Sequence, residues 1–403
     1  MVAIGRLSRY CLGTIALLFV LVGCSSDEDP EVSTFVSSDF LESNSRAEFR
    51  LLLQLTGVDI GSENWKYDVD LHRIRYNTEL DGATITTSAL VILPQTEEEV
   101  SLISFHRGTI TASDEAPSEL DINDGIATLY SGLSSLGLVA VFPDMIGFGS
   151  SLEMVHPYYL RDINANTVRD AIVAAADFAE QQGVDLDSDL YLAGYSQGGY
   201  ITMAAQRSIE QDAIRGFNLR ASFPAAGAYD VKGLQEYFFS LETYEQPYYL
   251  AYVGLAYQEY ASLDLELSDI FNQPYADRIP DLFDATLRNS EINEQLSFEI
   301  DELLTDEFIN GLETEEVYAD INNLLIENGL LDWTPRVPTF LYHGDADTFI
   351  PVQNSIDSYN QLLENGADED KLTLTIFPGE DHGGGTIPYA EDVALKLIEF
   401  LND

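Results

Sequence analysis

Ser196 stands in the segment Gly194-Tyr-Ser-Gln-Gly198, a G-x-S-x-G sequence with a further glycine after it. An apolar run at 190–193 leads into this segment, and helical periodicity follows over 198–209. In a sharp strand-to-helix turn the serine backbone is strained and the flanking positions have no room for a Cβ. The turn lifts the hydroxyl above the sheet beside a helix N-terminus, where backbone N–H groups favour developing negative charge. The pattern predicts a nucleophilic serine.

A serine nucleophile needs a base near neutral pH, ordinarily a histidine held by a carboxylate. The chain has five histidines, namely His72, His106, His156, His343 and His382. His382 lies in a glycine-rich loop just after the last predicted strand, and such loops hold the sites of α/β sheets. We therefore predict His382 as the base. His72 falls inside a predicted hairpin that precedes the parallel sheet, and we interpret it as structural.

The acid is expected from the loop after the preceding strand, which reads His343-Gly-Asp-Ala-Asp347. Asp347 is the predicted acid, and Asp345 in the same loop is the alternative. Glu380 and Asp381 are too close in sequence to His382 to orient its ring from behind.

The segments expected to position these residues alternate between two patterns of hydrophobicity. Short apolar runs occur at 102–105, 139–142, 190–193, 221–224, 339–342 and 372–377, and helical periodicity at 125–136, 163–181, 198–209 and 390–401. Continuous apolar strands between helices indicate a mostly parallel sheet covered on both faces, so the predicted fold class is α/β. Ahead of them, strand-like runs at 67–76 and 83–93 flank Asp81-Gly82 and predict an antiparallel hairpin.

Between 231 and 335 the alternation lapses. This segment shows helical periodicity, for example over 292–304 and 315–328, and is rich in aromatic residues over 231–260. We predict a mainly helical cap at 231–335, inserted into a core formed by 36–230 and 336–403. Its aromatic side chains either pack the interior of the cap or form a wall that faces a ligand.

The chain order Ser196, Asp347, His382 is the order of the α/β-hydrolases. The mature chain resembles that superfamily and, more narrowly, the secreted-lipase family of capped esterases and lipases. The strings that carry the resemblance are Phe142-Pro-Asp-Met-Ile-Gly-Phe-Gly149, His156-Pro-Tyr-Tyr159, 194–199, Phe223-Pro-Ala-Ala-Gly227 and 343–347. The resemblance implies an α/β-hydrolase fold, Ser196 as nucleophile, Asp347 as acid, His382 as base and 231–335 as the cap.

An oxyanion hole needs two backbone donors. The N–H of Gln197, next to the nucleophile, is the first. The second is expected from the loop after 102–105, which reads His106-Arg-Gly-Thr109. The family usually has His-Gly-Thr there, so alignment makes Thr109 the second donor and places Arg107 where a histidine is expected.

Candidate substrate contacts are Arg107, His106 and Tyr195. Arg107 either meets a substrate carboxylate or pairs with one of the many acids of the chain, and we favour the ion pair. His106 and His156 are otherwise interpreted as structural polar residues around the site.

The amino-acid composition argues against several classes of partner and cofactor site. The 403 residues include 69 acids and 19 basic residues, which gives a formal net charge of −50 and weighs against nucleic acid as a partner. The only two cysteines, Cys11 and Cys24, cannot build a disulfide framework or a structural zinc site. No metal motif is present, and Leu152 replaces the last glycine of a dinucleotide fingerprint at 147–152. We expect no cofactor and no metal, and the oligomeric state stays open.

Residues 1–23 read as a signal peptide, with Arg6 and Arg9 ahead of an apolar stretch at 10–22 that is too short to span a bilayer. Leu21-Val-Gly-Cys24 resembles the lipobox of bacterial lipoproteins, in which the cysteine is acylated. Residues 24–35 would then form a lipid-anchored tether, which places the protein in the cell envelope, at the outer membrane or cell surface. The alternative is an ordinary signal peptide with an incidental cysteine.

Taken together, these features predict a lipid-anchored serine hydrolase of short to medium acyl esters, with a small-molecule ester or lipid as substrate and an acyl-enzyme intermediate. A serine peptidase with the same fold is the alternative reaction, because the triad alone does not separate amides from esters. A surface binding lipoprotein with an inactive triad is the alternative from another class.

Overall fold

The structure is a computed structural model that describes residues 33–47, 50–51, 60–121 and 125–402. The predicted signal peptide, Cys24 and most of the predicted tether lie outside these residues. Within them, no helix combines the length and the apolarity needed to cross a bilayer.

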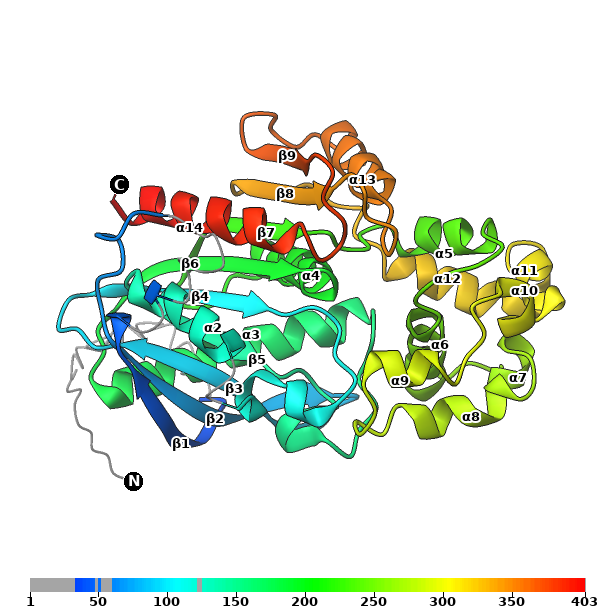
Figure 1. Ribbon diagram of the computed structural model, residues 1–403, viewed down its shortest axis with the longest axis horizontal. Coiled ribbons are helices and arrows are strands. Elements are labelled where there is room, and N and C mark those ends of the chain that lie inside the picture. Colours follow the sequence, from blue (N-terminus) through cyan, green and yellow to red (C-terminus); the bar gives the residue numbers. More distant parts are fainter. Residues whose placement is uncertain (1–32, 48–49, 52–59, 122–124, 403) are drawn as a thin grey trace, which may run out of the picture. The chain divides into compact units, whose positions relative to one another are not determined.

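One mixed sheet organises the described chain (Figure 1). Its strands are β1 (Phe35–Asn44), β2 (Val69–Leu80), β3 (Ala83–Pro94), β4 (Val100–His106), β5 (Leu138–Pro143), β6 (Leu186–Tyr195), β7 (Asn218–Ala225), β8 (Thr339–Gly344) and β9 (Leu372–Phe377). They lie in the order β1-β2-β3-β5-β4-β6-β7-β8-β9. The pairs from β1 to β5 are antiparallel, including the predicted hairpin, and all pairs from β5 to β9 are parallel. The predicted α/β class with a mostly parallel sheet is confirmed.

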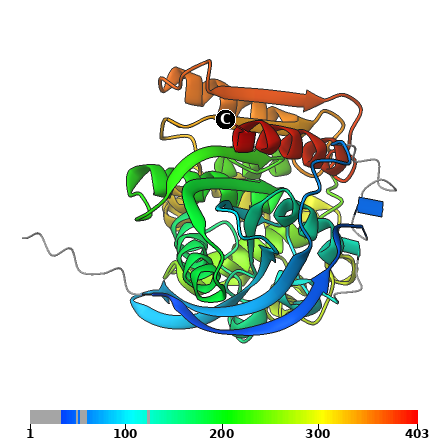
Figure 2. The ribbon, with the colours of Figure 1, turned by 90° about the vertical axis from the view of Figure 1, so that its left-hand side faces the viewer.

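Helices cover both faces of the sheet (Figure 2). They are α2 (Gly125–Ser135), α3 (Arg161–Gln182), α4 (Gln197–Gln211), α13 (Val352–Glu364) and α14 (Thr386–Asn402), and the short 3-10 helices η1 (Ser113–Glu115), η2 (Pro117–Glu119) and η3 (Gly149–Ser151) join loops. Alternate side chains of a strand point to opposite faces. Val91 of β3 therefore joins an apolar cluster with α3 and α4, while its neighbour Ile92 joins a second cluster with Leu397 of α14.

The strand order brings four strand ends to one edge of the sheet. β4 lies between β5 and β6, so the chain leaves β4 toward one neighbour and later returns on its other side. At the carboxyl ends, His106 of β4 pairs with Gly194 of β6, and Gly344 of β8 pairs with Phe377 of β9. The loops that follow these strands therefore open side by side, which is where open α/β sheets bind ligands.

A helical insertion connects β7 to β8 and lies beyond the ends toward which β4, β6 and β8 point (Figure 1). Its helices are α5 (Val231–Phe239), α6 (Tyr248–Tyr260), α7 (Leu267–Ile270), α8 (Tyr275–Leu282), α9 (Asn289–Asn293), α10 (Ile300–Leu303), α11 (Asp306–Gly311), η4 (Glu316–Tyr318) and α12 (Ala319–Glu327). Arg288 of the insertion forms an ion pair with Asp114 of the core at 2.7 Å. One apolar cluster runs through both, so the bounds of the predicted cap at 231 and 335 stay a prediction.

One local expectation differs from the structure. The helix predicted over 292–304 is wrong, because a turn at 294–296 and a bridge between Glu299 and Thr243 separate α9 from α10. There Tyr244 N donates to Phe298 O at 2.8 Å and Ile300 N to Glu242 O at 3.0 Å, so this chain uses its backbone groups outside any helix. The second predicted helix, over 315–328, is present as η4 followed by α12.

Candidate active site

Ser196 occupies the turn between β6 and α4 with φ 61° and ψ −124°, a conformation that L-residues rarely adopt. The chain around it is packed against the glycines. A Cβ on Gly194 would lie 2.3 Å from Gly198 O, one on Gly198 would lie 1.8 Å from His106 O, and one on Gly199 would lie 2.1 Å from Ala225 O. Each glycine of the motif is therefore required by a backbone oxygen close to it.

Gly198→Ala is expected to displace the loop after β4, since the new methyl group would overlap the carbonyl of His106. We expect an unfolding free energy lower by about 3 kcal/mol or more, and reduced ester hydrolysis. Urea denaturation and turnover of a chromogenic ester measure both effects. Gly216→Ala is the control, because Gly216 has φ +86° but no atom within 4 Å of its Cβ position, so only backbone strain of about 1 kcal/mol is added. A Gly198→Ala protein as stable as the control would contradict this packing.

His382, after β9, connects Ser196 to Asp347. Its Nε2 lies 2.8 Å from Ser196 Oγ, and its Nδ1 lies 2.6 Å from Asp347 Oδ2. An ionised carboxylate only accepts hydrogen bonds, so Nδ1–H donates to Asp347 and Nε2 is left to accept from the serine hydroxyl. The three residues that the sequence singled out for the triad are thus brought into one hydrogen-bonded series.

Asp347 is buried and its two carboxylate oxygens are fully used. Oδ1 accepts from the N–H groups of Phe349 and Ile350 at 2.8 and 3.0 Å. Burial alone would raise the pKa of the Asp347 carboxyl, but hydrogen bonds from His343 and His382 outweigh it and hold the pKa well below its usual range. The alternative acid, Asp345, is exposed and accepts from Gly379 N instead.

His343 is a member of this arrangement that the sequence did not predict. Its Nε2 lies 3.1 Å from Asp347 Oδ2 and 2.9 Å from Ile350 O, while its Nδ1 lies 2.7 Å from Ser355 Oγ. A carbonyl can only accept, so Nε2 carries the hydrogen and Nδ1 accepts from Ser355. His343 thus supports the carboxylate from the side opposite His382. Its only sequence signal was its place four residues before Asp347.

The two expected oxyanion donors flank the nucleophile. Gln197 is the first residue of α4, so its N–H has no partner within the helix. Thr109 follows Gly108, whose Cβ position is 3.4 Å from Ser196 Cβ, and the Thr109 hydroxyl hydrogen-bonds the Tyr158 hydroxyl at 2.8 Å. The roles of these two amides stay a prediction.

Solved structures share this architecture along nearly the whole chain. A Legionella pneumophila protein aligns with a TM-score of 0.81 and 24% identity over 91% of this chain and 97% of that chain. The rice cell-wall-degrading esterase LipA from Xanthomonas oryzae gives 0.78 and 24% over 92% and 98%. Lipase A from Candida antarctica gives 0.61 and 16% over 87% and 77%. The chain has the α/β-hydrolase fold. The expected resemblance is confirmed at this level.

Sequence comparison adds one family match. Residues 276–403 match the model of the prolyl oligopeptidase family, Peptidase_S9. This segment holds Asp347 and His382 but starts after Ser196. A comparison with curated proteins gives no match.

A further histidine, His156, holds the side chain of Gln197, the residue that follows Ser196. His156 Nδ1 lies 2.8 Å from Ile146 O, so that nitrogen donates. The Gln197 amide nitrogen lies 2.5 Å from His156 Nε2 and must be the donor there. His156 is therefore neutral and accepts a hydrogen bond from the Gln197 side chain. This contact agrees with its interpretation as a structural residue.

Burial makes the stability of the hydrolase fold depend on two histidines. It lowers the pKa of His156 to about 4 and that of His106 to about 3, against about 6.5 in an unfolded chain. As pH falls from 6.5 to about 4, the unfolded chain takes up protons that the folded chain does not, so the unfolding free energy falls by up to about 1.4 kcal/mol per pH unit for each histidine.

His156→Gln is therefore expected to reduce the pH slope of the unfolding free energy by about one proton, although the variant is less stable at pH 7. Urea denaturation of both proteins in steps from pH 7 to pH 4.5 measures the slopes. Parallel slopes for the two proteins would show that folding does not lower the pKa of His156.

Ser196 and His382 open into a cavity of about 690 Å³. Its apolar walls come mainly from α2 and α14, while α6 contributes Tyr248 and Tyr249 and α9 contributes Asn289. Tyr195 also lines it, with its ring edge-on to that of His382 at 5.6 Å between centroids. Among the described residues, no group of three or more His, Cys, Asp or Glu side chains is placed to hold a metal ion.

Two expectations about the loop after β4 need correction. His106 does not line this cavity: it is buried, and its ring nitrogens contact Ser104 Oγ at 3.0 Å and Thr202 Oγ1 at 2.8 Å. Its predicted substrate contact is therefore wrong. Arg107 does line the cavity, but the favoured ion pair is also wrong, because no carboxylate of the described chain pairs with its guanidinium.

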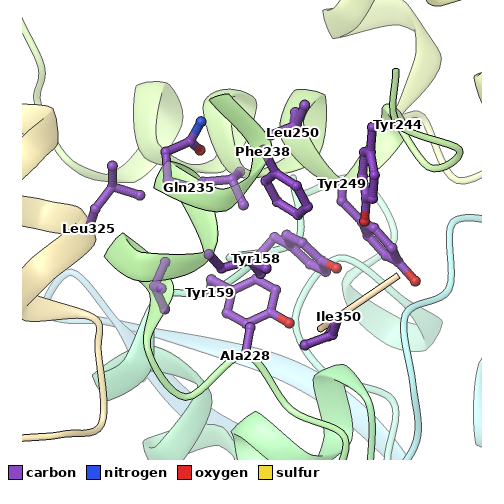
Figure 3. Close-up of a pocket in the computed structure, with 13 residues that line it drawn as sticks. Tyr158, Tyr159, Ala228, Gln235, Phe238, Tyr244, Tyr249, Leu250, Leu325 and Ile350 are labelled. Carbon is purple, nitrogen blue, oxygen red and sulfur yellow. The ribbon is translucent and has the colours of Figure 1, made fainter. Parts of the chain in front are cut away.

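Tyr249 of α6 is a residue of the insertion that interacts with Ser196. Nothing in the sequence distinguished it from the other aromatic residues of 231–260. Burial raises the pKa of the Tyr249 phenol, while hydrogen-bond interactions with nearby hydroxyls, those of Ser196 and Thr109 among them, oppose the rise. Tyr249 also borders a second cavity, of about 30 Å³. Figure 3 shows this cavity between side chains of the insertion, such as Phe238, and side chains of the core, such as Tyr159. Most of the aromatic cluster is thus interior packing, and Tyr248 and Tyr249 are the members that face the larger cavity.

Proposed function

We propose that the protein is a serine hydrolase of carboxylic esters. The observation that carries this proposal is the series from Ser196 Oγ through His382 to Asp347, with distances of 2.8 and 2.6 Å, at the wall of a large apolar cavity. The alignment with an esterase and a lipase over most of the chain supports it.

The geometry supports a two-step reaction. Ser196 Oγ attacks the ester carbonyl while His382 Nε2 takes its proton, and Asp347 stabilises the imidazolium that forms. The oxyanion is held by the amides of Gln197 and Thr109. His382 then protonates the leaving alcohol, and a water repeats the sequence on the acyl-enzyme to release the acid.

Aromatic and aliphatic walls suit a short to medium acyl chain or an apolar alcohol in the cavity. Binding such a group removes apolar surface from water, at about 25 cal/mol per Å². The substrate class proposed is therefore a small-molecule or lipid ester.

A peptidase is the second candidate, because residues 276–403 match the prolyl oligopeptidase family. That match begins after Ser196, whereas the esterase LipA aligns over 92% of this chain. We therefore place ester hydrolysis first.

A fluorophosphonate probe tests the nucleophile, and paired substrates test the reaction. We expect the probe to label one peptide, containing Ser196, and expect p-nitrophenyl esters to be hydrolysed while aminoacyl-anilides are not. Turnover of the anilides alone would replace the esterase proposal by the peptidase. A protein that is folded yet neither labelled nor active would be a binding lipoprotein.

We also propose that Cys24 carries a lipid that holds the protein at the cell envelope; the lipobox-like segment before it supports this proposal. Detergent phase partitioning of the full-length chain expressed in bacteria tests it. The wild-type protein is expected in the detergent phase and Cys24→Ser in the aqueous phase. Equal partitioning of the two would refute the anchor.

A further inference from the structure

The larger cavity has a charge character unlike that of the rest of the chain. Over the described residues, its lining contains no Asp or Glu, although the chain carries 69 acids against 19 basic residues. Among these lining residues, the one side chain with a permanent charge is that of Arg107, in the loop after β4. Although the protein is strongly acidic, the described lining of this cavity therefore has one positive charge and no negative charge.

Arg107 forms no ion pair with a carboxylate of the described chain. Its Nη1 is buried and makes no hydrogen bond. By comparison, Arg207, Arg169 and Arg161 are also mostly covered, and each pairs with an aspartate at 2.8 to 3.1 Å. Arg107 therefore lines the cavity without a carboxylate partner among the described residues.

An unpaired guanidinium in a partly buried site costs free energy, because burial removes water molecules from the charge and no other group takes their place. A ligand carboxylate removes the cost, because its two oxygens match the fork of N–H donors. With no second cation in the lining, the site fits a single negative charge better than a phosphate dianion.

We propose that the cavity selects esters that carry a free carboxylate besides the scissile ester group, and that Arg107 binds this carboxylate. This inference rests on the proposed esterase function and specifies its substrate class. Hydrolysis of such an ester consumes one water and yields an acid and an alcohol, one of which keeps the bound carboxylate.

Two matched substrate pairs test the proposal. Mono(4-nitrophenyl) adipate and its terminal amide differ by one charge on the acyl side, and 4-acetoxybenzoate and its methyl ester differ by one charge on the alcohol side. The measured quantity is the ratio of kcat/KM for the anionic and the neutral member. We expect a ratio of at least about 10 in one pair, because a hydrogen-bonded charge contributes about 1.5 to 3 kcal/mol.

Variants assign the preference to one side chain. Arg107→Gln should lower the ratio at least about tenfold, and Arg107→Lys should give an intermediate ratio, because it keeps the charge without the fork. Arg278→Gln is the control, since it removes one positive charge from an exposed position on α8. This control should leave the ratio at the wild-type value.

A measurement on the wild-type protein avoids dependence on folding of the variants. Adipate is expected to protect Ser196 from the fluorophosphonate probe, and adipamide is expected not to. Equal effects of the two compounds would count against the proposal.

The results distinguish failure of the esterase function from failure of the carboxylate selectivity. If no ester is hydrolysed, the proposed function fails. If neutral esters are hydrolysed and Arg107→Gln leaves both ratios at their wild-type values, the carboxylate selectivity is overturned and the esterase function stands.

Discussion

Ser196→Ala is expected to lower kcat for ester hydrolysis by about 10⁴- to 10⁶-fold. The hydroxyl lies 2.8 Å from His382 Nε2, and among the described residues no other hydroxyl hydrogen-bonds that nitrogen. Without it no acyl-enzyme forms, and only the residual effect of substrate binding and the oxyanion donors remains. Initial rates with a p-nitrophenyl ester at saturating substrate measure the loss.

Ser188→Ala is the matched control for this change. Ser188 is exposed at the far end of β6 and accepts only from Asn218 Nδ2. We expect wild-type kcat for the control and similar unfolding free energies for both variants. If Ser196→Ala kept a tenth of the wild-type rate, the assigned nucleophile would be wrong.

Asp347→Asn is expected to lower kcat by about 10⁴-fold. An asparagine can still accept from the N–H groups of Phe349 and Ile350 through its Oδ1, so its amide group would face His382 Nδ1. The imidazole then has to accept at Nδ1 and carry its hydrogen at Nε2, toward Ser196. In that tautomer it cannot take the serine proton.

The same substitution should cost about 1 to 3 kcal/mol of stability, because the new amide donor also faces the N–H of His343. Asp345→Asn is the control and tests the alternative acid in the same loop. It should retain near wild-type kcat, since Asp345 contacts Gly379 rather than His382. A larger loss of kcat in Asp345→Asn than in Asp347→Asn would reverse the assignment.

The parallel part of the sheet was predictable because most of its strands are largely buried and contain unbroken apolar runs, although β9 alternates with threonine and is mostly half-buried. The same property located the triad, since a residue that follows such a strand must lie at its carboxyl end. β1 escaped prediction for the opposite reason. It is an edge strand with sequence FVSSDFLESN, and its Phe40 is 60% exposed, so no apolar run marks it.

Other features depended on distances that sequence does not contain. The ion pair favoured for Arg107 assumed that the abundant acids lie everywhere, whereas the described residues that line the larger cavity include none. The place of Tyr249 over Ser196 depends on how α6 packs on the core. The support of Asp347 by His343 arises because the loop after β8 turns back on the strand end.

The sheet order also has a consequence for folding. The contact between Ser196 and His382 spans 186 residues, and the whole insertion lies between them. Closing so long a loop is entropically costly and slow, so β8 and β9 join the sheet late. A nascent chain that has reached the end of α12 already contains the proposed nucleophile and both proposed oxyanion donors, but neither the proposed acid nor the proposed base. Recovery of hydrolysis during refolding therefore reports the last long-range step, and a chain truncated anywhere before His382 is inert.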